Sequence, residues 1–289
     1  MKSSLKLGTR CSTLARHQAH YVKQLLISQY PQYEIEIVAI QSEGDIDKTT
    51  PLSEMGGKGV FIKSLEQALI AGEVDMAVHS MKDVTTELVP GSEISAYLTV
   101  DSPRDALCMT LPRNEQLKSV ADIPEKYTVA TGSLRRKSQL LYHRPDLKIV
   151  PIRGNVETRL QKLEETDKSV DAVMLSEAGL LRLGLQDYIA VSLSPHNFVP
   201  APGQGVIVVQ VRSNEKEIIK TIQSINDPDQ SQLSQLELDI VRRLGFDCRY
   251  PLGLYAQCDR QQYTIDAFNA DPQSLTGHYF KFILPVFDG

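Results

Sequence analysis

A set of arginines is the feature of this sequence that most strongly suggests a binding site. They lie at or shortly after the ends of apolar runs that are expected to be strands, or one turn into the next helix: Arg10, Arg135, Arg136, Arg153, Arg159 and Arg182. In open α/β sheets, ligands bind beyond the carboxyl ends of the strands, where helix N-termini also offer N–H donors. A guanidinium stays charged and can pair with a carboxylate through two N–H groups. The set predicts a pocket for a ligand with several carboxylates or phosphates, with surface salt bridges as the alternative for part of it.

The segment His79-Ser80-Met81-Lys82-Asp83 places a cation and a carboxylate side by side, directly after a predicted strand at residues 74–78. A carboxylate there could hold a substrate amine, move a proton or stabilise a developing positive charge. The alternative is structural, with Asp83 capping a helix and Lys82 in solvent. His79 is expected to pack or hydrogen-bond inside the fold.

Two glycine-containing segments are weaker candidates. Gly56-Gly57-Lys58-Gly59 lacks the spacing of a phosphate-binding loop and is expected to be a hinge before a helix that starts near Phe61. Gly203-Gln204-Gly205 precedes a predicted strand at residues 206–211 and could let the backbone approach a ligand. The polar stretch 41–59 is expected to be a lid or disordered.

Cys248 stands apart among four scattered cysteines, which are too few for a disulfide scaffold and form no zinc-binding pair. It lies in a loop after a helix that ends with Arg242 and Arg243, whose charge favours the thiolate, whereas Asp247 opposes it. No Cys–His pair can be assigned by spacing, so protease-type catalysis has no support. An inert thiol is the alternative for Cys248.

The composition limits the classes of protein to consider. The 289 residues suffice for two or three domains, and 42% hydrophobic with 23% charged residues is ordinary for a soluble globular protein. A net charge of −5 argues against nucleic-acid binding, and no aromatic residues are interleaved with the arginines. No apolar stretch resembles a signal peptide or a membrane span. We therefore expect a cytoplasmic protein with reduced thiols and no membrane partner.

The elements that would carry these residues alternate between strand and helix. Residues 5–7, 34–40 and 74–78 are predicted strands, and Ser12 is expected to cap the helix after the first. A second series has predicted strands at residues 127–131, 147–152 and 171–175. This alternation predicts α/β domains with largely parallel strands.

The second series opens like the first, because residues 130–136 parallel residues 7–12. Two similar α/β domains with a cleft between them are therefore expected. From about residue 217 the pattern changes to one helix, through residues 233–244, and then to short strands. A small α+β domain is expected there, with strands at residues 252–256, 263–267 and 279–284.

Taken together, these segments resemble the porphobilinogen deaminase family, also called hydroxymethylbilane synthase, over almost the whole chain. The resemblance lies in ordered motifs from both series and from the segment between them. They are Gly8-Thr9-Arg10 with Ser12, Gly56-Gly57-Lys58-Gly59-Val60-Phe61, His79-Ser80-Met81-Lys82-Asp83-Val84, Ser102-Pro103-Arg104-Asp105-Ala106, Ser133-Leu134-Arg135-Arg136, Arg153-Gly154-Asn155-Val156 with Thr158-Arg159-Leu160, Ala178-Gly179-Leu180 with Arg182-Leu183-Gly184, and Gly203-Gln204-Gly205.

The resemblance implies an α/β fold with two periplasmic-binding-protein-like (type II) domains flanking a cleft, plus a small α+β C-terminal domain. The implied domains are residues 1–97 with 198–216, residues 98–197, and residues 217–289. The implied reaction is a transfer that condenses four porphobilinogen molecules into hydroxymethylbilane, with loss of ammonia. It takes place on a dipyrromethane cofactor that is bound covalently through a thioether, by position to Cys248.

The resemblance also implies roles for single residues. Asp83 would be catalytic, stabilising positive charge on the pyrrole. The cofactor would be held by Cys248 (covalently), Lys82, Ser80, Thr131, Ser133, Arg135, Arg136, Arg153 and Asn155. The substrate would contact Arg10, Ser12, Arg159, Arg182, Lys58, Phe61 and Gln204. No metal is implied, and the partners would be porphobilinogen and the growing polypyrrole chain, bound by a monomer.

The sequence departs from the family pattern close to the implied attachment site. Phe246 and Asp247 stand where two small residues are common before the cysteine, and Glu237-Leu238 replaces a Glu-Arg pair. Gly132 replaces a serine, Thr85 replaces a proline, and Tyr250 stands where a small β-branched residue is common. These departures motivate a second hypothesis, a non-catalytic paralogue that binds a polycarboxylate pyrrole in the same arginine-lined cleft.

Overall fold

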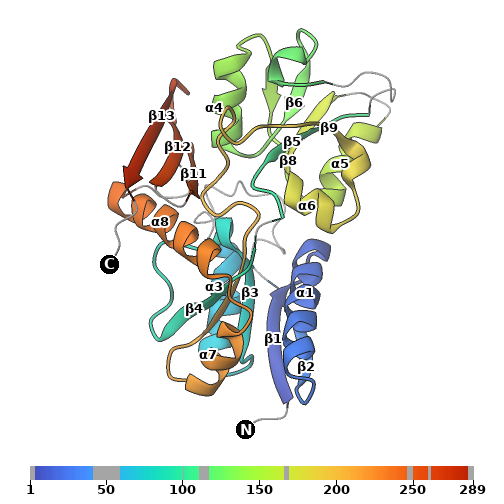
Figure 1. The fold of residues 1–289 in the computed structure, drawn as a ribbon. Helices are drawn as coiled ribbons and strands as arrows, with labels where there is room; N and C mark the ends of the chain where they lie inside the picture. Colours follow the sequence, from blue (N-terminus) through green and yellow to red (C-terminus); the bar gives the residue numbers. More distant parts are fainter. Residues whose placement is uncertain are drawn as a thin grey trace. The chain divides into compact units, whose positions relative to one another are not determined.

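The alternation of strands and helices builds two units in the computed structural model (Figure 1). The structure describes residues 4–41, 59–99, 101–110, 117–165, 169–245, 250–259 and 262–285. The first unit consists of Met1–Asp101 with Val206–Gln235, and the second of Ser102–Gly205 with Leu236–Gly289. The finer division into three domains stays a prediction.

A five-stranded sheet forms the centre of the first unit, in the order β2-β1-β3-β10-β4. Its strands are β1 (Ser4–Arg10), β2 (Glu34–Ile40), β3 (Met76–Ser80), β4 (Ser92–Tyr97) and β10 (Ile207–Arg212). β1 is parallel to β2 and β3, whereas β10 is antiparallel to β3 and β4. Leu7, Met76 and Val209, from three neighbouring strands, lie in one buried core cluster.

The sheet of the second unit repeats this arrangement, in the order β7-β6-β8-β5-β9. Its strands are β5 (Asp105–Cys108), β6 (Thr128–Ala130), β7 (Lys148–Val150), β8 (Ala172–Ser176) and β9 (Ile189–Ser192). β6 is parallel to β7 and β8, and β5 is antiparallel to β8 and β9. β1 and β6 hold the same position in the two sheet orders, so the expected similarity of residues 7–12 and 130–136 is confirmed.

The expectation of largely parallel strands is confirmed, with β5 and β10 as the exceptions. Parallel neighbours need a crossover connection, usually a helix. The chain passes from β4 of the first sheet to β5 of the second, and later returns from β9 of the second sheet to β10 of the first. In the described residues, no helix lies between the two strands in either passage. Each five-stranded sheet is therefore mixed, with four strands that run in one direction and one strand, β10 or β5, that runs the opposite way.

Among the described residues, the helices that lie wholly in the first unit are α1 (Thr13–Gln29), α3 (Gly59–Ile70) and α7 (Lys216–Gln223). α1 begins where the Ser12 Oγ accepts a hydrogen bond from the Ala15 N–H at 3.2 Å, which confirms Ser12 as the N-cap. Ala19, Val22 and Leu26 recur at helical spacing and are fully buried against the sheet. The cap and the buried stripe together fix where α1 starts and which face it turns inward.

The described helices of the second unit's α/β part are α4 (Leu134–His143), α5 (Val156–Glu164) and α6 (Glu177–Arg182). The first two begin with a side-chain cap, as α1 does. The Ser133 Oγ accepts from the Arg136 N–H at 3.4 Å, and the Asn155 Oδ1 accepts from the Thr158 N–H at 2.9 Å. Short 3-10 turns occur at Met81–Asp83 in the first unit, and at Val120–Asp122 and Gln186–Tyr188 in the second.

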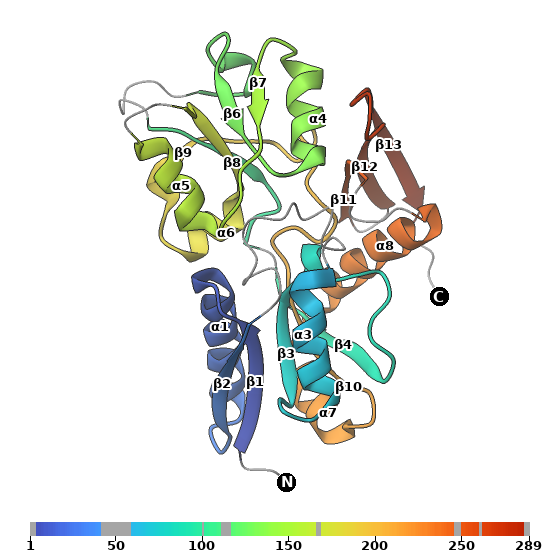
Figure 2. The same ribbon diagram turned by 180° about the vertical axis from the view of Figure 1, so that it is seen from behind.

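A three-stranded antiparallel sheet completes the second unit, in the order β11-β12-β13. Its strands are β11 (Leu252–Cys258), β12 (Gln262–Ala270) and β13 (Gly277–Pro285), each containing a predicted strand. One face packs on Val199 through Phe268, and the Tyr279 hydroxyl donates to the Gln139 Oε1 of α4 at 3.1 Å. Helix α8 (Pro228–Leu244) lies beside this sheet in both views (Figures 1 and 2). Across the described ranges, no helix has the length and apolarity to span a membrane.

Candidate active site

In the first unit, the predicted site residues come from one edge of the sheet. Arg10 is the last residue of β1, and Ser80 is the last residue of β3. These strands are parallel, with Leu7 opposite Met76, so their carboxyl ends share an edge. Ser12 caps the helix that starts there, and Lys82 follows β3 in the 3-10 turn. The structure therefore brings the predicted first-unit residues to the edge where α/β sheets bind ligands.

A pair of hydrogen bonds joins helix α1 to the end of β3. The Gln18 Nε2 donates to the Ser80 Oγ at 2.9 Å, and the Ser80 Oγ lies 3.1 Å from the Gln18 Oε1. Gln18 is buried on α1, only a few residues after Ser12. Because Ser80 precedes Lys82 and Asp83, this contact fixes the start of the turn that carries them. Sequence reasoning missed Gln18, although its place on the buried face of the helix was a usable signal.

Asp83 does not cap a helix, so the structural alternative for this residue is wrong. It is the last residue of the 3-10 turn Met81–Asp83, whose cap position is Ser80. The turn is closed by the Val84 N–H, which donates to the Met81 carbonyl at 2.9 Å. Among the residues that the structure describes, no hydrogen bond to the Asp83 carboxylate is recorded. Its charge raises the pKa of the neighbouring His79, which places the carboxylate close to that ring.

His79 has the structural role that the sequence predicts. Burial lowers its pKa to about 4, the hydrogen bond to Gln210 and the charge of Asp83 raise it, and the charge of Arg10 lowers it. The neutral ring shares a 3.0 Å hydrogen bond between its Nε2 and the Gln210 Oε1. The Gln210 Nε2 donates in turn to the Glu66 Oε1 at 2.9 Å. This buried network joins β3 to β10 and α3 directly behind the site edge.

In the second unit, the predicted residues gather around a carboxylate that sequence reasoning did not assign. Asp105 is the first residue of β5 and is fully buried. Arg135 reaches it with Nη1 to Oδ2 at 2.6 Å, and Arg136 with Nη2 to Oδ1 at 2.7 Å. Burial opposes the charge on Asp105, but the two guanidiniums hold its pKa well below the usual range. The signal was present in the motif Ser102-Pro103-Arg104-Asp105-Ala106.

The two arginines are more deeply buried than a ligand-contacting pair would require, at 5% and 6% exposed. The Arg135 Nη1 also donates to the Val199 carbonyl at 2.7 Å, and the Arg136 Nη1 to the Met174 carbonyl at 3.0 Å. One carboxylate is thus shared by two guanidiniums, which leaves the cluster with one net positive charge. Their contact with a cofactor stays a prediction.

Gln204 belongs to the same cluster. Its Nε2 donates to the Asp105 Oδ1 at 3.0 Å and to the Pro103 carbonyl at 2.8 Å. Its Oε1 is buried and has no partner among the described residues. It stands between Gly203 and Gly205, whose φ angles of +68° and +92° lie in the left-handed region that glycine favours. The glycines therefore allow the turn that brings Gln204 to Asp105.

The remaining hydroxyl and amide candidates of the second unit are used inside the fold. The Thr131 Oγ1 accepts from the Ser133 N–H at 3.2 Å, and Thr131 is buried. Ser133 and Asn155 are the N-caps of α4 and α5. All three lie where β6 and β7 end and the helices begin, so each is at the expected edge. Their contact with a ligand stays a prediction.

The other three arginines predicted to belong to the site also lie in the second unit. Arg153 is half-buried between β7 and α5. The Arg159 Nε donates to the Gly154 carbonyl at 2.8 Å. Arg182 is at the end of α6 rather than at a strand end, and its Nη2 donates to the Gly205 carbonyl at 2.5 Å. Arg182 thus supports the turn that carries Gln204.

Three predicted positions cannot be placed in the site. Lys58 and Cys248 lie outside the described residues, as does most of the stretch 41–59. Phe61 is in the first turn of α3, but its side chain is not described. Their roles stay predictions.

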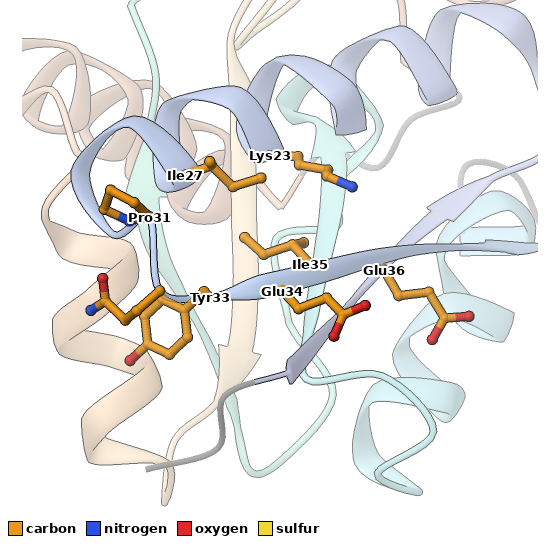
Figure 3. Close-up of a pocket in the computed structure, with 8 residues that line it drawn as sticks. Lys23, Ile27, Pro31, Tyr33, Glu34, Ile35 and Glu36 are labelled. Atoms are coloured by element: carbon orange, nitrogen blue, oxygen red, sulfur yellow. The ribbon is translucent and has the colours of Figure 1, made fainter.

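A shallow surface pocket of the first unit lies elsewhere (Figure 3). It is lined by Lys23 and Ile27 of α1 and by the start of β2, including Glu34 and Glu36. This is the amino end of β2, opposite to the strand ends that carry Arg10. Two carboxylates against one ammonium make the pocket unsuitable for a polycarboxylate ligand.

The chemistry of the candidate site follows from its donors. In the first unit, Arg10, Ser12 and the N-terminus of α1 can bind carboxylates, and Asp83 supplies a negative charge at the same edge of the sheet. In the second unit, considered by itself, guanidiniums, hydroxyl groups and the N-termini of α4 and α5 can bind carboxylates. No group of His, Cys, Asp and Glu within the described ranges is arranged to hold a metal ion. The residues present therefore fit a ligand that carries several carboxylates.

Comparison with known proteins identifies the family. Residues 5–220 match a family model described as porphobilinogen deaminase, dipyromethane cofactor binding domain. The chain belongs to the porphobilinogen deaminase family. The porphobilinogen deaminase of Syntrophomonas wolfei is 42% identical over 262 residues, which cover 91% of this chain and 83% of that protein. The porphobilinogen deaminase of Natranaerobius thermophilus is 41% identical over 253 residues, covering 88% and 79%.

Comparison with solved structures finds similarity at low sequence identity and low TM-score. The methionine-binding protein MetQ has a TM-score of 0.48 at 13% identity, covering 82% of this chain and 95% of that chain. The aliphatic sulphonate-binding protein SsuA from Escherichia coli has a TM-score of 0.41 at 16% identity, covering 86% and 76%. The two repeated sheet orders and the family match, rather than these scores, carry the fold assignment. The α/β class with a small C-terminal sheet, as expected of a porphobilinogen deaminase, is confirmed.

Proposed function

We propose that this protein is a hydroxymethylbilane synthase. It condenses four porphobilinogen molecules head to tail, releases one ammonia for each, and builds the chain on a covalent dipyrromethane cofactor. The observation that carries the proposal is the family match over residues 5–220, together with 42% identity to a porphobilinogen deaminase over 91% of the chain. The arginine-rich strand ends and Asp83 support it independently.

The substrate explains the donors. Each pyrrole ring of porphobilinogen carries an acetate and a propionate, so the growing chain accumulates two carboxylates per ring. Arg10, Ser12 and Lys82 in the first unit would bind such groups. In the second unit, Arg153 and Arg159 would do so, while Arg135 and Arg136 add the single net positive charge that Asp105 leaves to their cluster. Each guanidinium among them can orient a planar carboxylate through paired N–H donors, while Lys82 and Ser12 each offer a simpler donor.

Asp83 would act where charge develops. When the C–N bond of the aminomethyl group breaks, the nitrogen leaves as ammonia and the pyrrole becomes electron-poor. A new C–C bond then forms from the free α-carbon of the terminal ring, which afterwards loses its proton. Positive charge spreads over the pyrrole nitrogen in both steps, and a carboxylate beside that N–H stabilises it. The dipyrromethane group, when bound, supplies the first free α-carbon and stays attached to the protein.

Several finer features belong to this proposal. Cys248 would carry the cofactor through a thioether, with residues 41–59 as a lid over the site. The chain would divide into domains at residues 1–97 with 198–216, 98–197 and 217–289. The enzyme would be a cytoplasmic monomer without a nucleic-acid or membrane partner.

The test combines intact mass spectrometry with an ammonia-release assay on protein made with porphobilinogen available. Wild-type protein should carry a dipyrromethane mass increment that is absent from Cys248→Ala. Peptide mapping assigns the increment, because Cys11 and Cys258 are exposed thiols that serve as internal controls. Asp83→Asn should keep the increment and lose at least about 100-fold in turnover.

Two outcomes would contradict the proposal. Unmodified Cys248 in wild-type protein would rule out the attachment site. Tight binding of a polycarboxylate pyrrole without ammonia release would favour the non-catalytic paralogue, which Phe246 and Asp247 motivate. Normal turnover in Asp83→Asn would remove the role of that carboxylate.

A further inference from the structure

Glu237 is a buried carboxyl group that the proposed mechanism does not use. It lies on α8 within the second unit and is 6% exposed. Its Oε2 accepts from the Gly203 N–H at 2.7 Å, and its Oε1 accepts from the Ala256 N–H at 2.8 Å. No ion pair with a cation is recorded for it in the described part of the chain. Burial raises its pKa to about 7, against the lowering effect of the two N–H groups.

The first of these hydrogen bonds holds the turn that carries Gln204. Gly203 and Gly205 both have left-handed φ angles, and the turn lies outside the helices and strands. The regular backbone hydrogen bonds of a helix or a sheet therefore do not stabilise it. Gly203 hydrogen-bonds to Glu237, and the Gln204 N–H donates to the Ala201 carbonyl at 3.0 Å. Leaving a buried N–H without a partner is costly, so the hydrogen bond from Gly203 to Glu237 stabilises this conformation of the turn.

The turn connects directly to the arginine cluster. The Gln204 Nε2 donates to the Asp105 Oδ1, and Asp105 pairs with Arg135 and Arg136. A continuous path of hydrogen bonds therefore runs from Glu237 through Gly203 and Gln204 to both guanidiniums. Displacing the turn by 1 Å would break the 3.0 Å contact between Gln204 and Asp105.

The second hydrogen bond holds the edge of the C-terminal sheet. β11 is an edge strand, so alternate N–H groups have no neighbouring strand to bond. The Leu254 N–H donates to the Pro200 carbonyl at 2.9 Å, and the Ala256 N–H donates to Glu237. α8 ends at Leu244 and β11 begins at Leu252, so these two elements flank Cys248 in the sequence. Glu237 thus connects both of them to the turn at residues 203–205.

We infer that Glu237 is a positioning residue: its carboxylate holds the turn at residues 203–205 and the start of the C-terminal sheet together, and thereby sets Gln204 against the Asp105–Arg135–Arg136 cluster. The inference rests on the proposed function for its effect on substrate. Its structural part stands on the two hydrogen bonds alone. The ionised carboxylate holds both N–H groups most strongly, because protonation weakens one oxygen as an acceptor and adds an O–H donor that needs a partner of its own.

The test compares Glu237→Gln with Asp239→Asn. Asp239 is on the same helix, but it is exposed and pairs with Arg242 at the surface. Glutamine keeps the shape of Glu237 and one acceptor oxygen, while its NH₂ group faces the second N–H without accepting. Amide exchange of the peptides covering residues 201–206 and 252–258 should be at least about tenfold faster in Glu237→Gln and unchanged in Asp239→Asn.

Steady-state kinetics supply a readout that a purely structural role would not move. In Glu237→Gln, the KM for porphobilinogen should rise about tenfold with kcat within about threefold of wild type. In wild-type protein, KM should rise as the pH falls through about 7 and Glu237 gains a proton, and this dependence should be absent from Glu237→Gln. Tyr255 on β11, whose own pKa is raised by burial and by the charge of Glu237 and lowered by Arg104, stays neutral throughout this range.

The outcomes separate this inference from the proposed function. Unchanged exchange at residues 201–206 in Glu237→Gln would overturn the inference, as would a wild-type pH dependence of KM that persists in the variant. Absence of ammonia release by wild-type protein would refute the proposed function, and the exchange experiment would still decide the role of Glu237.

Discussion

Replacing Asp105 with asparagine removes the carboxylate that Arg135 and Arg136 share. Asp105 is fully buried and accepts hydrogen bonds from Arg135 at 2.6 and 3.2 Å, and from Arg136 at 2.8 Å. Asparagine keeps one acceptor oxygen but no charge. Both guanidiniums would then remain buried next to each other without a counter-charge. Removing one partner of a buried ion pair costs about 3–5 kcal/mol, and we expect Asp105→Asn to lose about 4 kcal/mol of the free energy of unfolding.

Arg144 and Asp146 supply a matched control on the same unit. Their ion pair has a similar distance, with Arg144 Nη2 to Asp146 Oδ2 at 2.7 Å, but the Asp146 side chain is 37% exposed. Water replaces the lost partner there, so Asp146→Asn should be much less destabilising than Asp105→Asn. The difference in the free energy of unfolding lost by the two variants therefore reports the effect of burial on the ion pair, and not the effect of its N–O distance.

The assay is urea unfolding at neutral pH, because urea does not screen charge as guanidinium chloride does. Arg136→Met is a third variant: it leaves Asp105 paired with Arg135, so it should cost less than Asp105→Asn. The double variant Asp105→Asn with Arg136→Met should lose less free energy of unfolding than the sum of the two single losses, since it leaves only one guanidinium without a counter-charge. The reasoning is refuted if Asp105→Asn is no more destabilising than Asp146→Asn, or if Arg136→Met costs as much as Asp105→Asn.

Two further predictions concern the first unit. The pKa of His79 is about 4 in the folded protein, against an ordinary value of 6.5, so between these pH values the unfolded chain binds more protons and stability falls as the pH drops from 6.5 to 4. The free energy of unfolding should fall by about 3 kcal/mol over this range. Urea midpoints measured across this pH range should show the fall in wild-type protein but not in His79→Gln, and an identical pH series in both proteins would contradict the buried neutral ring. Ser12→Ala removes the cap of α1 and should cost about 1 kcal/mol in the same assay, while Ser28→Ala, at an exposed hydroxyl near the other end of α1, should be close to neutral; equal losses would show that the cap hydrogen bond contributes nothing.

The charge distribution explains how an acidic chain could hold an acidic ligand. The net charge is −5, yet Arg10, Arg153 and Arg159 lie at or near strand ends in the two sheets. A guanidinium near a helix N-terminus acts locally, and charges more than about 10 Å away are screened by salt. Net charge therefore describes the surface, while the site depends on where single residues lie.

The fold shows which features follow from local pattern. Ser12 was identifiable as a cap because capping needs only an oxygen and an N–H three residues away. The strand at residues 34–40 was predicted with its observed bounds, because a run of apolar and β-branched residues specifies an extended segment. The direction of β5 and β10 was not predictable in this way, since it depends on which sheet the chain has just left.

By itself, the sequence determined the alternation of strands and helices, the cap of α1, the ordered motifs of the family, and the positions of Arg10 and Arg153 at or just after strand ends. Each of these depends on residues that are neighbours in the chain. Only the tertiary structure decided that Arg135 and Arg136 share Asp105, that Gln204 joins them, and that Glu237 is buried on two N–H groups. These partners are tens of residues apart, and their protonation and hydrogen bonding depend on burial, which exists only after the chain has packed.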